Sequence, residues 1–210
     1  MTTGFNKAMK ALPLVAILRG VRPEEVEAIG AALYAAGFRL IEVPLNSPEP
    51  LASIEALSRS LPADAVVGAG TVLTPEAAQQ VKGAGGQLLV MPHCDPALIR
   101  AAKALSLIAL PGVATPSEAF AALAAGADAL KLFPAEMLPP PVVKALRAVL
   151  PPTVALLPVG GIAPQGMAAY RAAGANGFGL GSALYAPGYT AEQVAERAQA
   201  FARAWHEQQR

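Results

Sequence analysis

Short apolar runs alternate with Ala- and Leu-rich helical stretches along the whole chain, and this alternation predicts its architecture. Four of the runs directly follow an Ala-Gly pair, at residues 36–41, 84–89, 125–130 and 173–178. Glycine just past a helix supplies a left-handed cap, so each pair predicts a helix end followed by a strand. Four further runs, at residues 14–18, 65–67, 107–110 and 155–159, bring the expected strands to eight.

Proline or acidic residues mark several helix starts, at residues 23–25, 74–76, 115–118 and 190–192, because both suit a first helical turn. Near-continuous apolar strands that alternate with helices are typical of a parallel sheet covered by helices. We therefore expect an α/β fold, a (β/α)8 TIM barrel in a single domain over residues 1–210. A short N-terminal lead-in at residues 1–11 and a C-terminal helix at residues 190–208 complete this expectation.

An open doubly wound sheet is the alternative architecture. It normally has fewer strands and a glycine-rich loop after the first one, where this chain has only Arg19 and Gly20. The eight-unit alternation favours the barrel.

Composition excludes several classes of protein. Of the 210 residues, 54% are hydrophobic and 15% charged, which excludes a disordered chain. The net charge is +1 and basic residues form no stripe with interleaved aromatics, so nucleic acid is not an expected partner. No apolar stretch approaches the length of a membrane span, and the single cysteine, Cys94, cannot form an internal disulfide. We expect a cytoplasmic protein with no membrane partner.

Lys131 is the first candidate for chemistry. It lies in an apolar run, residues 129–134, that is typical of a strand buried on both faces. Burial favours the neutral amine, which can attack a carbonyl carbon and form a Schiff base. The structural alternative is a lysine whose stem is buried while its head reaches solvent.

Further polar residues stand where the predicted strands end, which is where barrel enzymes place their active sites. Glu42 lies inside the second strand and could transfer protons beside an iminium, or only pair with Lys131 or Arg19. Arg19 follows the first strand and could bind a carboxylate or phosphate, or form a structural ion pair. Thr71 follows the third and could bind a substrate carboxylate, or cap the next helix.

Glycines after the last two strands point to phosphate. Gly160 and Gly161 follow the seventh, and Gly181 with Ser182 ends the eighth. Loops at these two places commonly bind phosphate through backbone N–H groups, although glycines can also serve only tight turns.

Metal binding is not expected. The chain has two histidines, His93 and His206, and the neighbours of His93, Cys94 and Asp95, do not converge like a zinc site. We therefore expect no metal and no other cofactor.

Five motifs in order, at residues 17–20, 41–48, 68–73, 130–136 and 160–162, resemble those of the class I aldolases that act on 2-keto-3-deoxy-6-phospho sugar acids. The resemblance runs from about Leu12 to Tyr185. It implies a (β/α)8 barrel, usually a homotrimer, that cleaves a phosphorylated keto-deoxy sugar acid to pyruvate and glyceraldehyde 3-phosphate.

The resemblance also implies roles for the candidate residues. Lys131 matches the Schiff-base lysine and Glu42 the acid/base. Arg19 and Thr71 match positions at the pyruvyl end. Positions that bind the distal part of the substrate and its phosphate are matched by Gly160, Gly161, Gly181 and Ser182.

Two positions indicate a branch of this family. Asn46 stands where the gluconate-type enzymes generally carry arginine, and Val159 where they carry threonine. Both positions look like the 6-phosphogalactonate branch, whose substrate differs at C4, so we expect them to set specificity. A gluconate-type or dual-specificity aldolase is the nearest alternative. A phosphate-binding barrel enzyme without imine chemistry and a barrel retained as a ligand sensor are remote ones.

Overall fold

The structure, a computed structural model, describes residues 3–207. Within them, parallel strands alternate with α-helices. The strands are β1 (Leu14–Ile17), β2 (Leu40–Pro44), β3 (Val66–Gly70), β4 (Leu88–Val90), β5 (Ile108–Leu110), β6 (Gly112–Val113), β7 (Leu130–Leu132), β8 (Leu156–Pro158) and β9 (Phe178–Leu180). The α-helices are α1 (Thr3–Ala11), α2 (Pro23–Ala35), α3 (Pro50–Ser60), α4 (Pro75–Gly83), α5 (Pro96–Ala104), α6 (Pro116–Ala124), α7 (Pro140–Val149), α8 (Met167–Ala172) and α9 (Ala191–Glu207), and two 3-10 turns are η1 (Ala135–Met137) and η2 (Pro164–Gly166).

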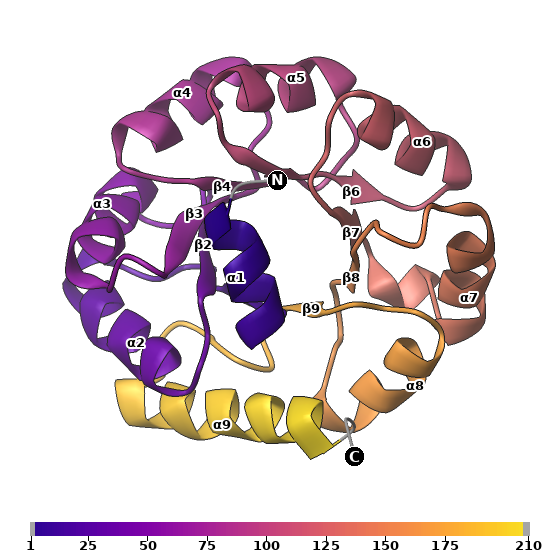
Figure 1. Ribbon diagram of the computed structural model, residues 1–210. Coiled ribbons are helices and arrows are strands. Elements are labelled where there is room, and N and C mark those ends of the chain that lie inside the picture. The colour runs from indigo at the N-terminus through magenta and orange to yellow at the C-terminus, as the bar shows by residue number, and fades with distance from the viewer. Residues whose placement is uncertain (1–2, 208–210) are drawn as a thin grey trace.

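The strands surround a common centre, and helices α2 to α9 lie outside them (Figure 1). The α/β class is therefore as expected, but the prediction of a closed eight-stranded (β/α)8 barrel is wrong. Hydrogen bonds divide the strands into a six-stranded sheet, in the order β5-β4-β3-β2-β1-β9, and a three-stranded sheet, in the order β6-β7-β8. We call this arrangement of two sheets the strand ring.

Local chemistry explains the first break between the sheets. The expected fifth strand is divided at Pro111, which has no backbone N–H to donate, so β5 stays in one sheet and β6 joins the other. At the other break, a bridge between Val159 and Gly179 and a hydrogen bond from the Asn176 N–H to the Leu156 carbonyl, at 2.9 Å, join the two segments, but β8 and β9 belong to different sheets. The side chain of Asn176 adds another bond here, since its Oδ1 accepts the Leu156 N–H at 2.9 Å.

Asp128 joins the two sheets across the first break. Its N–H donates to the Ala109 carbonyl in β5 at 3.0 Å, and its Oδ2 accepts the Ala109 N–H at 2.9 Å. The same oxygen pairs with Lys103 Nζ at 2.5 Å. A buried carboxylate with these partners replaces the ladder bonds that the sequence does not supply here.

Helix starts follow the sequence closely. Proline occupies the first turn of α2, α4 and α6, and Thr74 and Thr115 cap α4 and α6 with their side chains. In the expected N-terminal lead-in, Thr3–Ala11 forms a helix. Since β1 begins soon after Ala11, this helix lies at the amino ends of the strands, across the centre of the ring (Figure 1).

The apolar core has two parts. The larger one lies between the strands and the outer helices. The smaller one fills the inside of the ring, where Phe5 and Ala8 of α1 pack against inward-facing strand residues such as Val15, Leu40 and Leu157. Helix α1 therefore closes the amino end of the ring, and the other end is left for polar groups.

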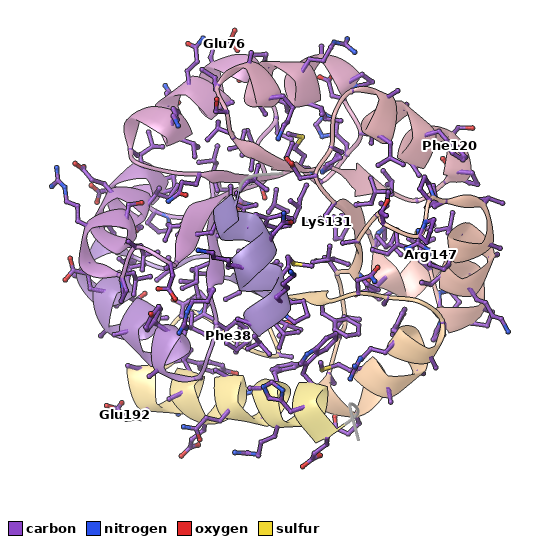
Figure 2. All side chains as sticks on the ribbon, viewed as in Figure 1. Phe38, Glu76, Phe120, Lys131, Arg147 and Glu192 are labelled. Atoms are coloured by element: carbon purple, nitrogen blue, oxygen red, sulfur yellow. The ribbon has the colours of Figure 1, made fainter. Side chains whose placement is uncertain are left out.

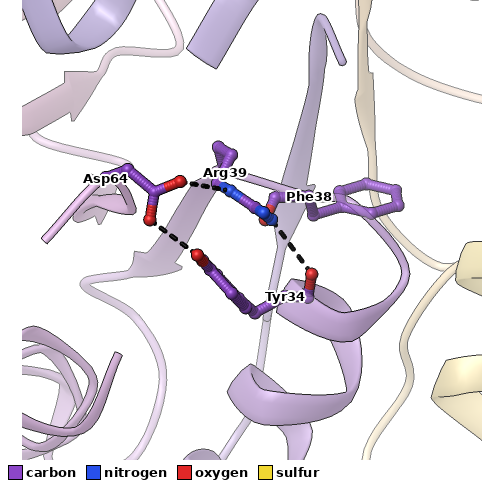
Figure 3. Close-up of polar contacts among 4 residues, drawn as sticks. All are labelled: Tyr34, Phe38, Arg39 and Asp64. Atoms are coloured by element: carbon purple, nitrogen blue, oxygen red, sulfur yellow. Dashed lines mark hydrogen bonds and ion pairs between the residues drawn. The ribbon is translucent and has the colours of Figure 1, made fainter. Parts of the chain in front are cut away.

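The amino end of β2 is held by three residues from three segments (Figure 3). Asp64, before β3, accepts the Tyr34 hydroxyl at 2.7 Å and Arg39 Nε at 2.8 Å. The Arg39 guanidinium lies 3.6 Å from the centre of the Tyr34 ring and donates to the Tyr34 carbonyl. These contacts fix the strand that carries Glu42 at the end opposite to the polar groups.

Within the described residues, none of the helices combines the length and the apolar character that crossing a membrane requires.

Candidate active site

A cavity of about 210 Å³ opens where β1, β7, β8 and β9 end. Seven of the residues that line it were expected from the sequence to belong to a site: Arg19, Lys131, Val159, Gly160, Gly161, Gly181 and Ser182. The cavity therefore collects residues that are up to 163 positions apart in the chain. Its position at the carboxyl ends of parallel strands is the usual one for ligands in α/β proteins.

Lys131 rises from the middle of β7 into the centre of the ring (Figure 2). Its neighbours in register are Gly112 of β6 and Leu157 of β8. The side chain is 6% exposed. Burial lowers the pKa of the Lys131 ammonium, and the positive charge of Arg19 lowers it further, while Glu42 opposes the change. The neutral amine is thus more populated than on an exposed lysine.

Glu42 faces the same space from β2, where it pairs in register with Ile17 and Gly68. It is 2% exposed, and burial raises the pKa of its carboxyl to about 7, although Lys131 and Arg19 pull it down. Its Oε2 has no hydrogen-bond partner in the described part of the chain. A carboxyl that titrates near neutrality can both give and take a proton at that pH.

An apolar floor lies beneath these two side chains. Glu42 and Lys131 border the same small internal space, whose other walls are Val15, Ile17, Val90, Leu110, Leu157, Val159 and Gly179. Among residues 3–207, no ion pair joins Glu42 to Lys131 or to Arg19. The interpretation of Glu42 as one half of a structural salt bridge is therefore not supported.

Gly70, at the end of β3, makes room for the Glu42 carboxyl. A Cβ atom at this position would lie only 1.9 Å from Glu42 Oε2 and 2.4 Å from its Oε1. Because glycine has no side chain, the backbone of β3 lies closer to the Glu42 carboxyl than it could with any other residue at position 70.

Arg19 and Asn46 form one unit at the mouth of the cavity. The Arg19 Nη1 group donates to Asn46 Oδ1 at 2.8 Å, and the next residue, Gly20, donates its N–H to Ser47 Oγ at 2.9 Å. These bonds fix the loop after β1 to the loop after β2. Asn46 itself does not line the cavity, so its contact with the site runs through Arg19.

Thr71 is placed differently from the other expected site residues. It is half-buried after β3 and lines neither the cavity nor the apolar floor. Its φ of 55° lies in the left-handed region, which costs a non-glycine residue energy and is often found at functional sites. Thr71 directly follows Gly70, the residue that lies against the Glu42 carboxyl, and its role at the pyruvyl end stays a prediction.

The glycine-rich ends of β8 and β9 offer hydrogen-bond donors to the cavity. Gly160 and Gly161 have φ values of 118° and 60°. Within the described residues, the N–H groups of Gly161, Gly181 and Ser182 have no protein acceptor. Unpaired backbone N–H groups at such loops suit an anion.

Val159 lies between the mouth and the floor, because it lines both. It is 7% exposed and packs on Gly179, where a Cβ would lie 2.6 Å from Val159 Cγ2. Its methyl groups therefore shape the wall between the Lys131 amine and the glycine-rich end.

Sequence reasoning missed five of the lining residues: Ile17, Ile162, Ala183, Phe133 and Glu136. The aromatic and the charged ones are Phe133 and Glu136. Both follow Lys131 within one segment, so closeness to the lysine was the signal that could have found them. Lys131 Nζ lies 4.5 Å from the centre of the Phe133 ring. Nowhere in residues 3–207 do three or more His, Cys, Asp or Glu side chains form a group that could hold a metal ion.

Comparison with known proteins identifies the chain as an aldolase, an enzyme that breaks and forms carbon–carbon bonds. A family model described as KDPG and KHG aldolase matches residues 5–199. The chain belongs to the KDPG and KHG aldolase family.

Its relatives include two curated proteins and one solved structure. "Probable 2-dehydro-3-deoxy-6-phosphogalactonate aldolase" of Rhizobium meliloti (strain 1021) is 49% identical over 89% of this chain and 88% of the relative. "2-dehydro-3-deoxy-6-phosphogalactonate aldolase" of Escherichia coli (strain K12) is 45% identical over 93% of this chain and 96% of the relative. The solved structure of native KDPGal is 45% identical, with a TM-score of 0.92 over 94% of this chain and 96% of that one.

We expect Gly70→Ala to lower kcat by roughly 100-fold or more, because the added methyl group displaces the Glu42 carboxyl, and small displacements of a reacting group cost rates of this order. Gly83→Ala, at the end of α4, is the matched control, since nothing lies within 4 Å of its Cβ position. Steady-state kinetics of both folded variants test this. A Gly70→Ala enzyme as active as the Gly83→Ala enzyme would show that the carboxyl is not held where the structure places it.

Proposed function

We propose that this protein is a class I aldolase that cleaves 2-dehydro-3-deoxy-6-phosphogalactonate to pyruvate and glyceraldehyde 3-phosphate through a Schiff base on Lys131. One observation carries the proposal. A lysine with a lowered pKa faces a carboxyl with a raised pKa across an apolar floor, at the base of a cavity that has unpaired N–H groups at its far side. The names of the relatives supply the substrate.

The first step joins substrate to enzyme. The neutral Lys131 amine attacks the C2 carbonyl carbon, and the Glu42 carboxyl transfers protons until the C2 oxygen leaves as water. The product is an iminium that can accept an electron pair. Because the floor is apolar, little water is present to compete for these protons.

The second step breaks the C3–C4 bond. Glu42, now a carboxylate, accepts the proton of the C4 hydroxyl, the bond electrons move to the iminium as an enamine, and the phosphorylated aldehyde leaves. Protonation of C3 and attack of water on the resulting imine then release pyruvate and restore the Lys131 amine. No step requires a metal or another cofactor.

The remaining residues hold the two ends of the substrate. Arg19, fixed by Asn46, is the cation available to the carboxylate. The N–H groups of Gly161, Gly181 and Ser182, with Gly160 beside them, are the donors available to the phosphate. Thr71, which follows Gly70 beside Glu42, stays the predicted second contact of the carboxylate at the pyruvyl end.

We also propose that the protein forms a homotrimer. Its support is the family resemblance, together with four large apolar side chains that are about half exposed or more: Leu73, Phe120, Met137 and Val149. Exposed apolar groups of this size favour contact with another chain. A single domain over residues 1–210 and a location in the cytoplasm also stay predictions.

Lys131→Met tests the Schiff-base chemistry, because methionine keeps the volume of the side chain and removes the amine. We expect kcat for cleavage to fall at least about 1,000-fold. Lys144→Met, on the exposed face of α7, is the matched control and keeps wild-type kinetics. If Lys131→Met kept activity within tenfold, the enzyme would belong to the barrel enzymes without imine chemistry.

Val159→Thr tests the branch. We expect the wild-type enzyme to have the higher kcat/KM for the galactonate epimer, and Val159→Thr to move the ratio toward the gluconate epimer by roughly 10-fold or more. The reason is that a hydroxyl placed beside C4 can bind the C4 oxygen in one configuration and not in the other. A wild-type preference for the gluconate epimer would contradict the galactonate assignment and favour the gluconate-type or dual-specificity alternative.

A further inference from the structure

Glu136 is a charged residue that lines the cavity and has no role in the proposed mechanism. It is exposed, lies in the turn η1 just after β7, and lines the same cavity as Arg19 and Lys131. Its negative charge stands at the end where the proposed function places a phosphate, which is also negative. Like charges at one subsite require an explanation.

The backbone of η1 is firmly held. The Ala135 N–H donates to the Val159 carbonyl at 2.9 Å, and the Tyr170 hydroxyl donates to the Ala135 carbonyl at 3.0 Å. One bond attaches the turn to the end of β8 and the other to α8. The root of the Glu136 side chain is therefore fixed relative to Gly160 and Gly161.

The carboxylate lies against those two glycines. A Cβ atom on Gly160 would be 2.3 Å from Glu136 Oε2, and one on Gly161 would be 3.2 Å from Oε1. In the described part of the chain, the Glu136 oxygens accept no hydrogen bond and form no ion pair. The charge thus lies beside the glycine loop, and no partner among the described residues neutralises it.

We propose that Glu136 is a specificity-determining residue that weakens phosphate binding at the glycine-rich end of the cavity. This inference rests on the proposed function, because it places the phosphate at Gly161, Gly181 and Ser182. Repulsion between the carboxylate and the phosphate lowers the affinity for the phosphorylated aldehyde after C3–C4 cleavage. Release of that product therefore becomes faster, while the pyruvyl end, bound at Arg19 and Lys131, is affected less because it lies farther away.

The test is a titration of inorganic phosphate, followed by 31P NMR, with the whole protein and no substrate. Glu136→Gln keeps the shape of the side chain and removes its charge, so we expect the Kd for phosphate to fall about 5- to 10-fold. The Kd for pyruvate is expected to change less than twofold, which a general structural change would not spare. The matched control is Glu76→Gln, whose side chain lies on the outer rim (Figure 2), and it leaves both values unchanged.

The outcomes separate this inference from the proposed function. If wild-type protein binds phosphate and Glu136→Gln binds it equally or more weakly, Glu136 does not oppose the phosphate and the inference is overturned alone. If neither protein binds phosphate, the phosphate end of the proposed function fails, and the inference fails with it. A tighter Kd in Glu136→Gln, absent from Glu76→Gln, supports both.

Discussion

The removal of Lys131 and Glu42 from water is the constraint on which the rest of the structure depends. Charged side chains are rarely buried without a close partner, because the loss of hydration is costly. Here no ion pair joins the two groups, and both lie above an apolar floor. Burial therefore raises the pKa of Glu42 and lowers that of Lys131, and both shifts favour the neutral forms. Neutral amine and neutral acid are the forms that imine chemistry requires at its start.

The fold maintains this burial from several sides. Helix α1 lies across the amino end of the strand ring and packs Phe5 and Ala8 against the inward-facing strand residues. Gly70 brings the backbone of β3 against the Glu42 carboxyl. Asp128 joins the two sheets where Pro111 interrupts the hydrogen bonds, and this keeps β7, which carries Lys131, in place relative to the six-stranded sheet. The ring thus tolerates two breaks because other groups supply the missing bonds.

Much of this was predictable from the sequence. Apolar runs located the strands because buried parallel strands are apolar on both faces, and Lys131 and Glu42 were conspicuous because they interrupt such runs. Closure of the ring was predicted wrongly, since it depends on hydrogen bonds between particular strands. Pro111 interrupts these bonds at one break, and at the other β8 and β9 share only an isolated bridge and the contacts of Asn176. The contact of Arg19 with Asn46 and that of Glu136 with Gly160 were not predictable, because each joins residues from distant segments whose side-chain directions only the folded chain defines.

The central claim is that burial makes Lys131 the nucleophile, and trapping with pyruvate and borohydride tests it most directly. Reduction converts a pyruvyl imine into a stable secondary amine that intact mass and peptide mapping can locate. The account predicts one reduced pyruvyl adduct per chain, on Lys131, absent without borohydride, with labelling half-maximal at a pH below the usual pKa of a lysine. A folded protein that gives no adduct, or gives it on exposed lysines in place of Lys131, would contradict the account.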